Sequence, residues 1–317
     1  MHLLWVWRRL VLVCTNMLRP ILALDIGATK IIIGLVRGGR VIHTEQYETR
    51  TLLRHGGDIH LLLARLQALS RPNIERVAVG FAGPVHGGAI SKSVNFQAGV
   101  IPDNFPLARI LNRRLGVPAT VFNDAHCFVT GEAVYGAGQG KRCVVGLTLG
   151  TGVGGGIVLN GQLYIGAHDV AGEFGHIPFP SSDTRCGCGQ RGHLETVLSG
   201  PGLRRLYAEV SGRDEPSEAV VRAARHGDRA ARASLAAIEE ALVHLLLTIL
   251  AVWDPDIIVV GGGFARIPKL LINARHRARQ LVPYKELRRT AIVPSLLNNN
   301  AVLIGAVRLA ANTRRPQ

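Results

Sequence analysis

The densest group of side chains able to do chemistry lies between residues 173 and 195. It reads E-F-G-H, then C-G-C-G-Q-R-G-H, then L-E. Two thiolates, Cys186 and Cys188, and two imidazoles, His176 and His193, form a donor set that suits tetrahedral Zn²⁺ and leaves no open position for water. The sequence therefore predicts a structural zinc loop. The alternative is a glycine-rich loop with two buried thiols and two solvated histidines.

The same segment predicts fixed positions for two carboxylates. Gly187, Gly189 and Gly192 let the backbone fold tightly between the ligands. A closed zinc site would hold the flanking Glu173 and Glu195 in place. The metal would therefore shape a neighbouring reaction site without taking part in the reaction.

An aspartate at the end of a strand is the candidate general base. The strand ATVFN at 119–123 runs into Asn123-Asp124, which opens a helix through Ala133. A carboxylate there lies at the positive end of a helix and at the carboxyl end of a strand, where it would take a proton from a substrate hydroxyl. The alternative is that both residues only cap the helix, although one residue can serve both purposes.

Two glycine-containing turns are the candidates for contact with phosphate. One is D-I-G-A-T-K at 25–30 and the other is G-T-G at 150–152. Backbone amides of such turns approach phosphate closely, so the pair predicts a cleft for a nucleotide triphosphate. Asp25 would suit a magnesium-bound water, and Thr29 or Thr151 would donate hydroxyl hydrogen bonds to phosphate oxygens. The alternative is two plain hairpin turns, but the duplication favours phosphate binding.

A third glycine run marks a place for an adenine ring. The strand DIIVV at 256–260 leads into Gly261, Gly262 and Gly263, and then Phe264. A backbone without side chains would let the ring lie close to it. The alternative is an ordinary turn between a strand and a helix, and both interpretations can hold together.

The elements that must position these residues alternate strands with helices. In the first half, two strands, a Gly38-Gly39 turn and a third strand form a β-meander, and helices and buried strands follow it. This alternation predicts an α/β sheet. The predicted strands cover 21–26, 30–36, 41–48, 76–83 and 119–123, and the predicted helices cover 58–70 and 106–115.

The opening pattern returns in the second half. Strands at 143–149 and 153–159 flank the G-T-G turn, and Asn160-Gly161 leads to a further strand, QLYIG. A β-turn-β theme used twice, about 120 residues apart, predicts two related halves that face one another.

Composition limits the class of protein. With 317 residues, 47% of them hydrophobic, the chain is long enough for two domains with real cores. The net charge is +15, but the arginines are scattered, and no nucleic-acid partner is expected. Of the five cysteines, Cys14, Cys127 and Cys143 lie in apolar stretches, which favours buried thiols in a reducing cytoplasm.

The N-terminal extension, residues 1–16, is treated separately. Leu3–Val13 is apolar but interrupted by Arg8-Arg9, lacks a small-residue cleavage site and is too short to span a bilayer. Because Met17 stands just before the first strand, the extension is a mis-assigned start or a frayed addition to the fold. No membrane partner is expected.

Seven motifs follow one another along the chain: DIGATK, GFAGPV, NDAHCF, LGTGVGGGIVLNG, AGEFGH, CGCGQRGHLE and VVGGG. In this order and spacing they resemble the ROK family of sugar kinases, which have a two-domain, actin-like ATPase (ribonuclease H-like) fold. The resemblance covers nearly everything from Leu22 to Ala310. The run RCGCGQRGHLETVLSG, with NDAHCF and WDPDIIVVGGG, is most similar to the bacterial N-acetylglucosamine kinases.

The resemblance implies ATP as phosphoryl donor, Mg²⁺, transfer to the 6-hydroxyl of a sugar, and frequent homodimerisation. We expect a small domain at 17–122 plus 300–317 and a large domain at 123–299, with an interdomain cleft and the zinc loop at 173–195. Asp124 would match the catalytic aspartate. The sugar would bind to Gly83, Asn95, Asn123, Asp124, Glu173, His176 and Glu195, and ATP to Asp25, Gly27, Thr29, Lys30, Gly150, Thr151, Gly152, Gly261 and Gly262.

This sequence departs from the family pattern in three places. The second glycine of the first phosphate turn is Ala28, which is tolerated if that residue keeps a negative φ. The usual third zinc cysteine is His193, so zinc affinity could fall. The glycine and aspartate expected before the last helix are replaced by Asn298 to Asn300, and the sequence offers no physical account of that change.

The identity of the sugar and the class of protein leave alternatives open. Glucose, fructose or N-acetylmannosamine could replace N-acetylglucosamine, because the side chains that read the 2-substituent are not visible in the sequence. Sugar-responsive repressors belong to the same family, but they carry a helix-turn-helix domain, and only 24 residues precede Asp25. A catalytically inactive sugar sensor is the other alternative, against which the intact Asp124 argues.

Overall fold

The structure is a computed structural model that describes residues 19–70, 73–91, 96 and 99–312. Asn95, the N-terminal extension and Cys14 lie outside the described residues. The chain divides into two compact units. Unit 1 runs from the first described residue to Cys127 and resumes at Asn299, whereas unit 2 comprises Phe128–Asn298.

Unit 1 contains a five-stranded sheet in the order β3-β2-β1-β4-β7. Strand β1 pairs antiparallel with β2 and parallel with β4, and β4 pairs parallel with β7. Gly38 and Gly39 both have positive φ (56° and 74°), which the tight turn between β2 and β3 requires. The strands are β1 (Ile21–Ile26), β2 (Lys30–Arg37), β3 (Arg40–Glu48), β4 (Val77–Phe81) and β7 (Ala119–Asn123).

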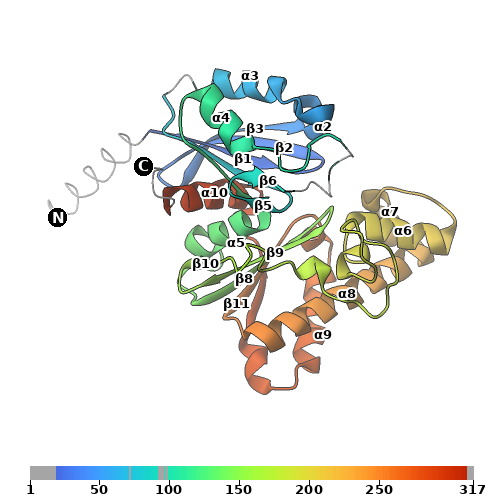
Figure 1. Ribbon diagram of the computed structural model, residues 1–317. Helices are drawn as coiled ribbons and strands as arrows, with labels where there is room; N and C mark the ends of the chain where they lie inside the picture. The colour runs from blue at the N-terminus through green and yellow to red at the C-terminus, as the bar shows by residue number, and fades with distance from the viewer. Residues whose placement is uncertain (1–18, 71–72, 92–95, 97–98, 313–317) are drawn as a thin grey trace. The chain divides into compact units, whose positions relative to one another are not determined.

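Helices cover both faces of this sheet. Figure 1 shows α3 (His60–Leu69) and α4 (Leu107–Leu115) on one face and α10 (Ala301–Asn312) on the other. Alternate residues of β1 supply the two cores, because Leu24 packs with Leu66, whereas Ala23 packs with Leu303. The shorter elements are α2 (Thr49–Leu52), η1 (His55–Gly57), β5 (Val85–His86) and β6 (Ala89–Ile90).

Unit 2 repeats the same topology. Its sheet has the order β10-β9-β8-β11-β12, with β8 antiparallel to β9 and parallel to β11. Asn160 and Gly161 have φ of 51° and 77° in the turn between β9 and β10. The predicted duplication is therefore confirmed at the level of strand order. The strands are β8 (Cys143–Leu149), β9 (Val153–Leu159), β10 (Gln162–Tyr164), β11 (Ile257–Gly261) and β12 (Ala291–Pro294).

Helix α5 (Asp124–Tyr135) packs against one face of the second sheet, and the main core of unit 2 lies on the other. A Cβ at Gly146 would overlap Val129, and one at Gly261 would overlap Phe128, so these glycines bring α5 close to the strands. The other elements are η2 (Phe174–His176), η3 (Leu194–Thr196), α6 (Gly200–Ser211), α7 (Ser217–Arg225), α8 (Arg229–Trp253), η4 (Phe264–Arg266), α9 (Leu270–Leu281), η5 (Lys285–Arg289) and η6 (Asn298–Asn300).

Helix α8 has the length and composition of a membrane span, but it belongs to the core of unit 2. Leu242, Leu246 and Ile249 are buried there against the sheet and the neighbouring helices. An apolar helix of this length is what the central helix of a large core requires, since it is covered on several sides. The helix is therefore weak support for a membrane location.

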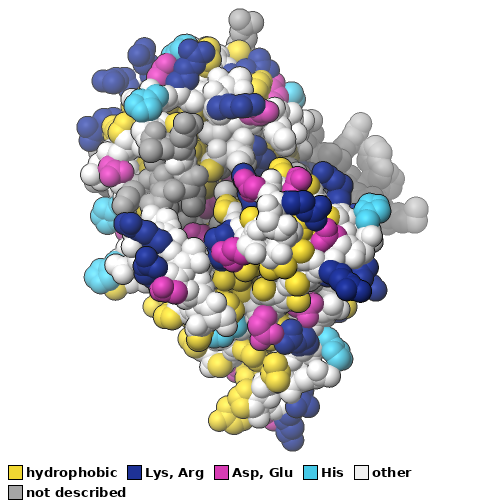
Figure 2. All heavy atoms as spheres, turned by 90° about the vertical axis from the view of Figure 1, so that its right-hand side faces the viewer, with side chains coloured by type: hydrophobic (Ala, Val, Ile, Leu, Met, Phe, Trp, Pro, Cys, Tyr) yellow, Lys and Arg dark blue, Asp and Glu magenta, His cyan; other side chains and the backbone are white. Residues whose placement is uncertain are grey.

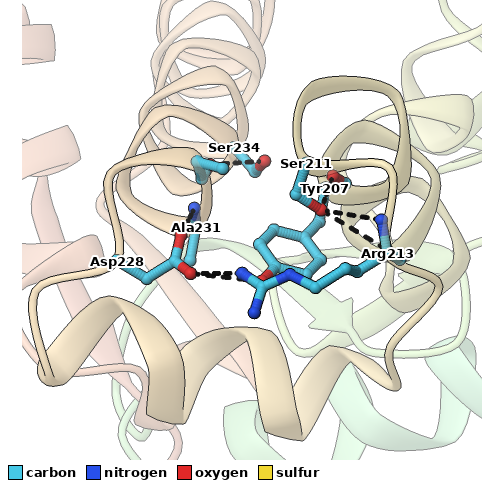
Figure 3. A network of polar contacts seen from close by, with 7 residues as sticks. Tyr207, Ser211, Arg213, Asp228, Ala231 and Ser234 are labelled. Carbon is cyan, nitrogen blue, oxygen red and sulfur yellow. Dashed lines mark hydrogen bonds and ion pairs between the residues drawn. The ribbon is translucent and has the colours of Figure 1, made fainter.

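A polar network fixes the start of α8 (Figure 3). Asp228 accepts a hydrogen bond from the Ala231 amide at 2.9 Å, which caps the helix, and it forms an ion pair with Arg213. The Arg213 guanidinium also lies over the Tyr207 ring, 5.1 Å from its centroid. Ser211 joins the same group by accepting a hydrogen bond from the Arg213 amide at 3.1 Å. The end of α6 is thus fastened to the beginning of α8.

The distribution of charged side chains and the burial of the cysteine thiols agree only in part with the expectations from composition. Figure 2 shows Lys and Arg side chains scattered among Asp and Glu over the face that it presents. Cys127 is buried, as predicted, whereas Cys143 is only partly buried. The reason is that Cys143 begins β8, where its Sγ lies 4.0 Å from the Trp253 carbonyl oxygen at the border of the core.

Candidate functional site

The carboxyl ends of three parallel strands meet at one edge of the first sheet. In the register, Ile26 lies opposite Phe81, and Phe81 lies opposite Asn123. The predicted site residues of unit 1 therefore lie together at this edge, because each is close to the end of its strand or just beyond it. These residues are Asp25 and Gly27 from β1, Gly83 after β4, and Asn123 and Asp124 at the end of β7.

Asn123 and Asp124 have different roles at the start of α5. Asn123 Oδ1 accepts a hydrogen bond from the His126 amide at 3.0 Å, and its Nδ2 donates one to the Gly83 carbonyl at 3.1 Å. Asn123 is therefore the residue that caps the helix. Asp124 occupies the first helical position, where its Oδ1 accepts from the Ala125 amide at 2.9 Å. The carboxylate thus lies at the positive end of the helix dipole.

The first phosphate turn is closed by the backbone. The Gly27 amide donates to the Lys30 carbonyl at 2.9 Å, and the Thr49 hydroxyl donates to the Gly27 carbonyl at 2.6 Å. Among the described residues, those with positive φ other than glycine do not include Ala28. The condition for replacing the second glycine by alanine is therefore met.

The carboxylate of Asp25 lies in a poorly solvated place. Burial raises the pKa of Asp25 to about 6, against an opposing effect of Lys30. Burial, followed by the charges of Asp124 and Asp25, raises the pKa of the Cys127 thiol well above its usual range, which places all three side chains in one neighbourhood. A nearby cation stabilises a buried anion. The Asp25 carboxylate is therefore suited to bind a water molecule of a bound Mg²⁺.

Asp25→Asn should therefore stabilise the ligand-free protein at neutral pH. The native carboxyl group binds its proton more tightly than the unfolded one, so the wild type loses stability as the pH rises from about 4 to about 6. Above that window the loss is complete and amounts to up to about 3 kcal/mol, which the amide avoids. Urea unfolding at about pH 4.5 and pH 8 measures the difference.

The control for this prediction is Asp256→Asn. Hydrogen bonds from the Cys143 and Arg142 amides lower the pKa of Asp256, so the wild-type residue gains stability as the pH rises and its amide variant should lose it. A stability difference between Asp25→Asn and the wild type that does not grow with pH would contradict the prediction.

The second phosphate turn is anchored to neighbouring elements of unit 2. The Gly150 amide donates to the Gly152 carbonyl at 3.0 Å, and the Gly200 amide at the start of α6 donates to the Gly150 carbonyl at 2.8 Å. Gly262, which follows β11, has a φ of 86° and lies so close to the Leu149 carbonyl that a Cβ would overlap it. The absence of a side chain at Gly262 therefore lets the ends of β8 and β11 lie close together.

The four predicted zinc ligands meet in space. The ligand atoms of His176, Cys186, Cys188 and His193 all lie within 4.8 Å of one another. The backbone is suited to this, because Gly189 and Gly192 have φ of 101° and 73°. The two ends of the loop are also paired, since the Leu194 amide donates to the Ile177 carbonyl at 3.0 Å and the Phe179 amide to the Gly192 carbonyl at 2.8 Å.

The distances within this cluster fit a tetrahedral zinc ion. With usual zinc bond lengths, tetrahedral geometry sets the N···N edge at about 3.3 Å and the N···S edges at about 3.6 Å. His176 Nδ1 lies 3.3 Å from His193 Nδ1 and 3.7 Å from Cys186 Sγ, and Cys188 Sγ lies 3.3 Å from His193 Nδ1. Burial raises the pKa of the Cys186 thiol to about 11, so a thiolate there is favoured only by a bound cation.

Two glutamates border the cluster. His176 turns its Nδ1 to the cluster and its Nε2 to Glu173, 3.8 Å from the carboxylate, as outer carboxylates commonly bind metal-ligating histidines. Glu195 Oε2 accepts from the Val153 amide at 2.8 Å, and its Oε1 lies 3.9 Å from Cys186 Sγ. One residue, Glu195, therefore joins the predicted zinc loop to the strand that follows the second phosphate turn.

Comparison with known proteins identifies relatives over most of the chain. The model of the ROK family matches residues 21–313. The N-acetylgalactosamine kinase of Shewanella sp. (strain ANA-3) is 34% identical over 78% of this chain and 83% of its own length. The N-acetyl-D-glucosamine kinase of Escherichia coli O157:H7 is 32% identical over 82% of this chain and 89% of its own length.

The fold is also similar to that of a solved structure. The ROK family glucokinase from Streptomyces griseus, crystallised in complex with glucose and AMPPNP, matches 93% of this chain and all of its own chain with a TM-score of 0.77 and 29% identity. The α/β class and the actin-like ATPase architecture expected from the sequence are therefore confirmed.

Proposed function

This chain belongs to the ROK family, and from that premise we propose that it is a sugar kinase that transfers the γ-phosphate of ATP to the 6-hydroxyl of N-acetylglucosamine. The observation that carries the proposal is the placement of Asp124 in unit 1. It lies at the positive end of α5, beside Cys127, whose pKa responds to both Asp124 and Asp25. A base for the sugar hydroxyl and a carboxylate for the nucleotide side thus leave the same sheet edge.

In this proposal Asp124 takes the proton of the 6-hydroxyl as the bond to phosphorus forms. The oxygen that loses the proton attacks the γ-phosphorus, and ADP leaves with the bridging oxygen. The turns at 25–30 and 150–152 would face the phosphates with backbone amides other than those of Gly27 and Gly150, which donate within the turns, and Lys30 would supply a positive charge. Bound Mg²⁺ would neutralise phosphate charge, and Asp25 would hold one of its waters.

In the same proposal, Asn123, Glu173, His176 and Glu195 bind the sugar hydroxyls. His176 and Glu195 suit this role because contacts within unit 2 hold them in place: His176 Nδ1 lies 3.3 Å from His193 Nδ1, and Glu195 Oε2 accepts from the Val153 amide at 2.8 Å. Excluding water from the bound sugar would favour transfer to the hydroxyl over hydrolysis of ATP. We also propose that the chain works in the cytoplasm as a homodimer.

N-acetylglucosamine is proposed over other sugars because of the loop CGCGQRGHLE and the relative from Escherichia coli. The relative from Shewanella is an N-acetylgalactosamine kinase, so N-acetylgalactosamine is a further candidate sugar. Glucose, fructose and N-acetylmannosamine remain alternatives. The relevant differences are the 2-substituent and the orientation of the 4-hydroxyl, and a hydrogen-bonding site discriminates such groups strongly.

An ADP-coupled assay with ATP, Mg²⁺ and each of these sugars tests the proposal. We expect the largest kcat/KM for N-acetylglucosamine, by about tenfold or more over the non-acetylated sugars. A higher value for another sugar would reject the proposed substrate and keep the kinase. No turnover with any sugar, from a folded sample that binds sugar, would instead indicate a sugar sensor.

A further inference from the structure

Glu132 is a completely buried carboxylate that none of the roles above uses. Each of its oxygens accepts two hydrogen bonds. Oε1 accepts from the Ser295 hydroxyl at 2.5 Å and from the Leu297 amide at 2.9 Å. Oε2 accepts from the Ala137 amide at 2.9 Å and from the Leu296 amide at 3.3 Å. We call these five residues the Glu132 cluster.

The cluster requires a carboxylate and no other group. An ionised carboxyl group has about four acceptor positions and no donor, and here four donors fill them. The isosteric amide of glutamine would replace one oxygen by an NH₂ group that faces two donors. Such a mismatch leaves buried donors without an acceptor, which destabilises the cluster.

The cluster lies next to both places where the chain passes between the units. Glu132 is on α5, the helix that begins at Asp124 in unit 1 and continues beyond Cys127 into unit 2. Ser295–Leu297 come just before the return of the chain to unit 1 at Asn299. Three hydrogen bonds within unit 2 therefore join the outgoing helix to the returning segment, and the fourth comes from Ala137, just after the helix.

The returning segment continues this connection toward the first sheet. The Asn298 amide donates to the Ser295 hydroxyl oxygen at 2.8 Å, and Asn298 has a φ of 52°, which asparagine tolerates better than most residues. The chain then enters η6 and α10, which packs on β1 and β4. Asp25 is the last but one residue of β1, so the Glu132 cluster connects α5, which begins at Asp124, with the segment that leads to the helix packed on β1.

We propose that Glu132 is a positioning residue that holds α5 in the orientation that Asp124 needs for proton transfer. It touches neither substrate and acts through the helix. An error of about 1 Å in the placement of a catalytic group can reduce a rate about 100-fold. Loss of the Glu132 hydrogen bonds should therefore slow the reaction, although Glu132 lies about two helical turns from Asp124. The effect on turnover rests on the proposed function, whereas the effect on helix order does not.

Gly136 provides a second way to disturb the cluster. A Cβ at this position would overlap Glu132 Oε2, so Gly136→Ala displaces the carboxylate while leaving its charge in place. Ser295→Ala is the milder variant, because it removes one of the four donors and leaves the backbone donors intact. Glu209→Gln is the matched control, since Glu209 is exposed on α6, where it forms an ion pair with Arg205.

The experiment compares Glu132→Gln, Gly136→Ala, Ser295→Ala and Glu209→Gln. Steady-state kinetics at a temperature well below unfolding should show kcat reduced about 10- to 100-fold for Glu132→Gln, with KM for ATP changed less than about threefold. Gly136→Ala should follow the same direction, Ser295→Ala should lose a few-fold, and Glu209→Gln should match the wild type. Amide hydrogen exchange is the readout that does not depend on activity.

The exchange pattern distinguishes positioning from a purely local role. We expect Glu132→Gln to speed exchange at Leu296 and Leu297 and also at Ala125 and His126 in the first turn of α5. Faster exchange confined to Ala137, Leu296 and Leu297, with unchanged kcat, would overturn the proposal. If exchange spreads to the first turn but no sugar is phosphorylated by any form, the proposed function fails and the positioning role stands.

Discussion

Asp124→Asn is expected to lower kcat by about 10²- to 10⁴-fold, the range that a positioned general base supplies. The amide has the size of the carboxylate but does not accept the proton of a sugar hydroxyl. Its oxygen still accepts the Ala125 amide, and the cap of α5 is Asn123, which is unchanged. The free energy of unfolding should therefore change by no more than about 0.5 to 1 kcal/mol.

Three measurements make this prediction sharp. Kinetics give kcat, urea unfolding gives stability, and calorimetry gives the sugar Kd, which should change by less than about tenfold because the neighbouring binding groups remain. Asp214→Asn is the control, since Asp214 is an exposed residue that follows α6 and forms an ion pair with Arg204. A variant at Asp124 that kept half of the wild-type kcat would remove this residue from the reaction.

The sheets were the easiest part of the fold to predict, for a physical reason. Short apolar runs bounded by turn residues are local signals, so ILALDI, ATVFN and CVVGLTL were predicted with the bounds that β1, β7 and β8 have. The Gly38-Gly39 and Asn160-Gly161 turns were also predicted, because their positive φ values select these residues. The equal strand order of the two units follows from the repeated pattern.

The Glu132 cluster could not be predicted from sequence. No motif in the sequence includes Glu132. Three of its four hydrogen-bond donors lie 163 to 165 residues away along the chain. Two of those donors are backbone amides, which every residue except proline carries, so no residue type announces them. The asparagines at 298–300 could not be explained from sequence for a similar reason. The positive φ of Asn298 is a property of the folded turn, and the sequence alone does not show it.

The predicted zinc loop could be predicted from sequence only in part. The four donors were found from their types and close spacing, but the pairing of His176 Nε2 with Glu173 and of Glu195 with the Val153 amide depends on how η2 and η3 dock on β9. Gly155 permits that docking, since a Cβ there would overlap Phe174. The sequence thus predicted the donor set, whereas the contacts that connect it to Glu173 and to β9 depend on tertiary structure.

Those contacts lead to the second large effect, which is the loss of zinc. We expect one zinc per chain by elemental analysis, and Cys186→Ser or prolonged chelation should remove it. At a zinc concentration about 100 to 1,000 times Kd, binding contributes about 3 to 4 kcal/mol to stability, which removal abolishes. Because His176 and Glu195 then lose their fixed positions, kcat/KM for the sugar should fall about 10- to 100-fold.

Matched variants separate the metal from the thiol. Cys143→Ser removes a partly buried thiol outside the loop and should keep zinc, stability and activity. His193→Cys adds a third thiolate, which should tighten zinc binding and make the protein harder to inactivate with a chelator. If Cys186→Ser retained one zinc per chain, or if wild type purified without zinc were as stable and active as after zinc is added, the four residues would be an ordinary loop. The expected order of chelator resistance, with His193→Cys above wild type and wild type above Cys186→Ser, follows from the number of thiolates alone and is therefore independent of which sugar the protein phosphorylates.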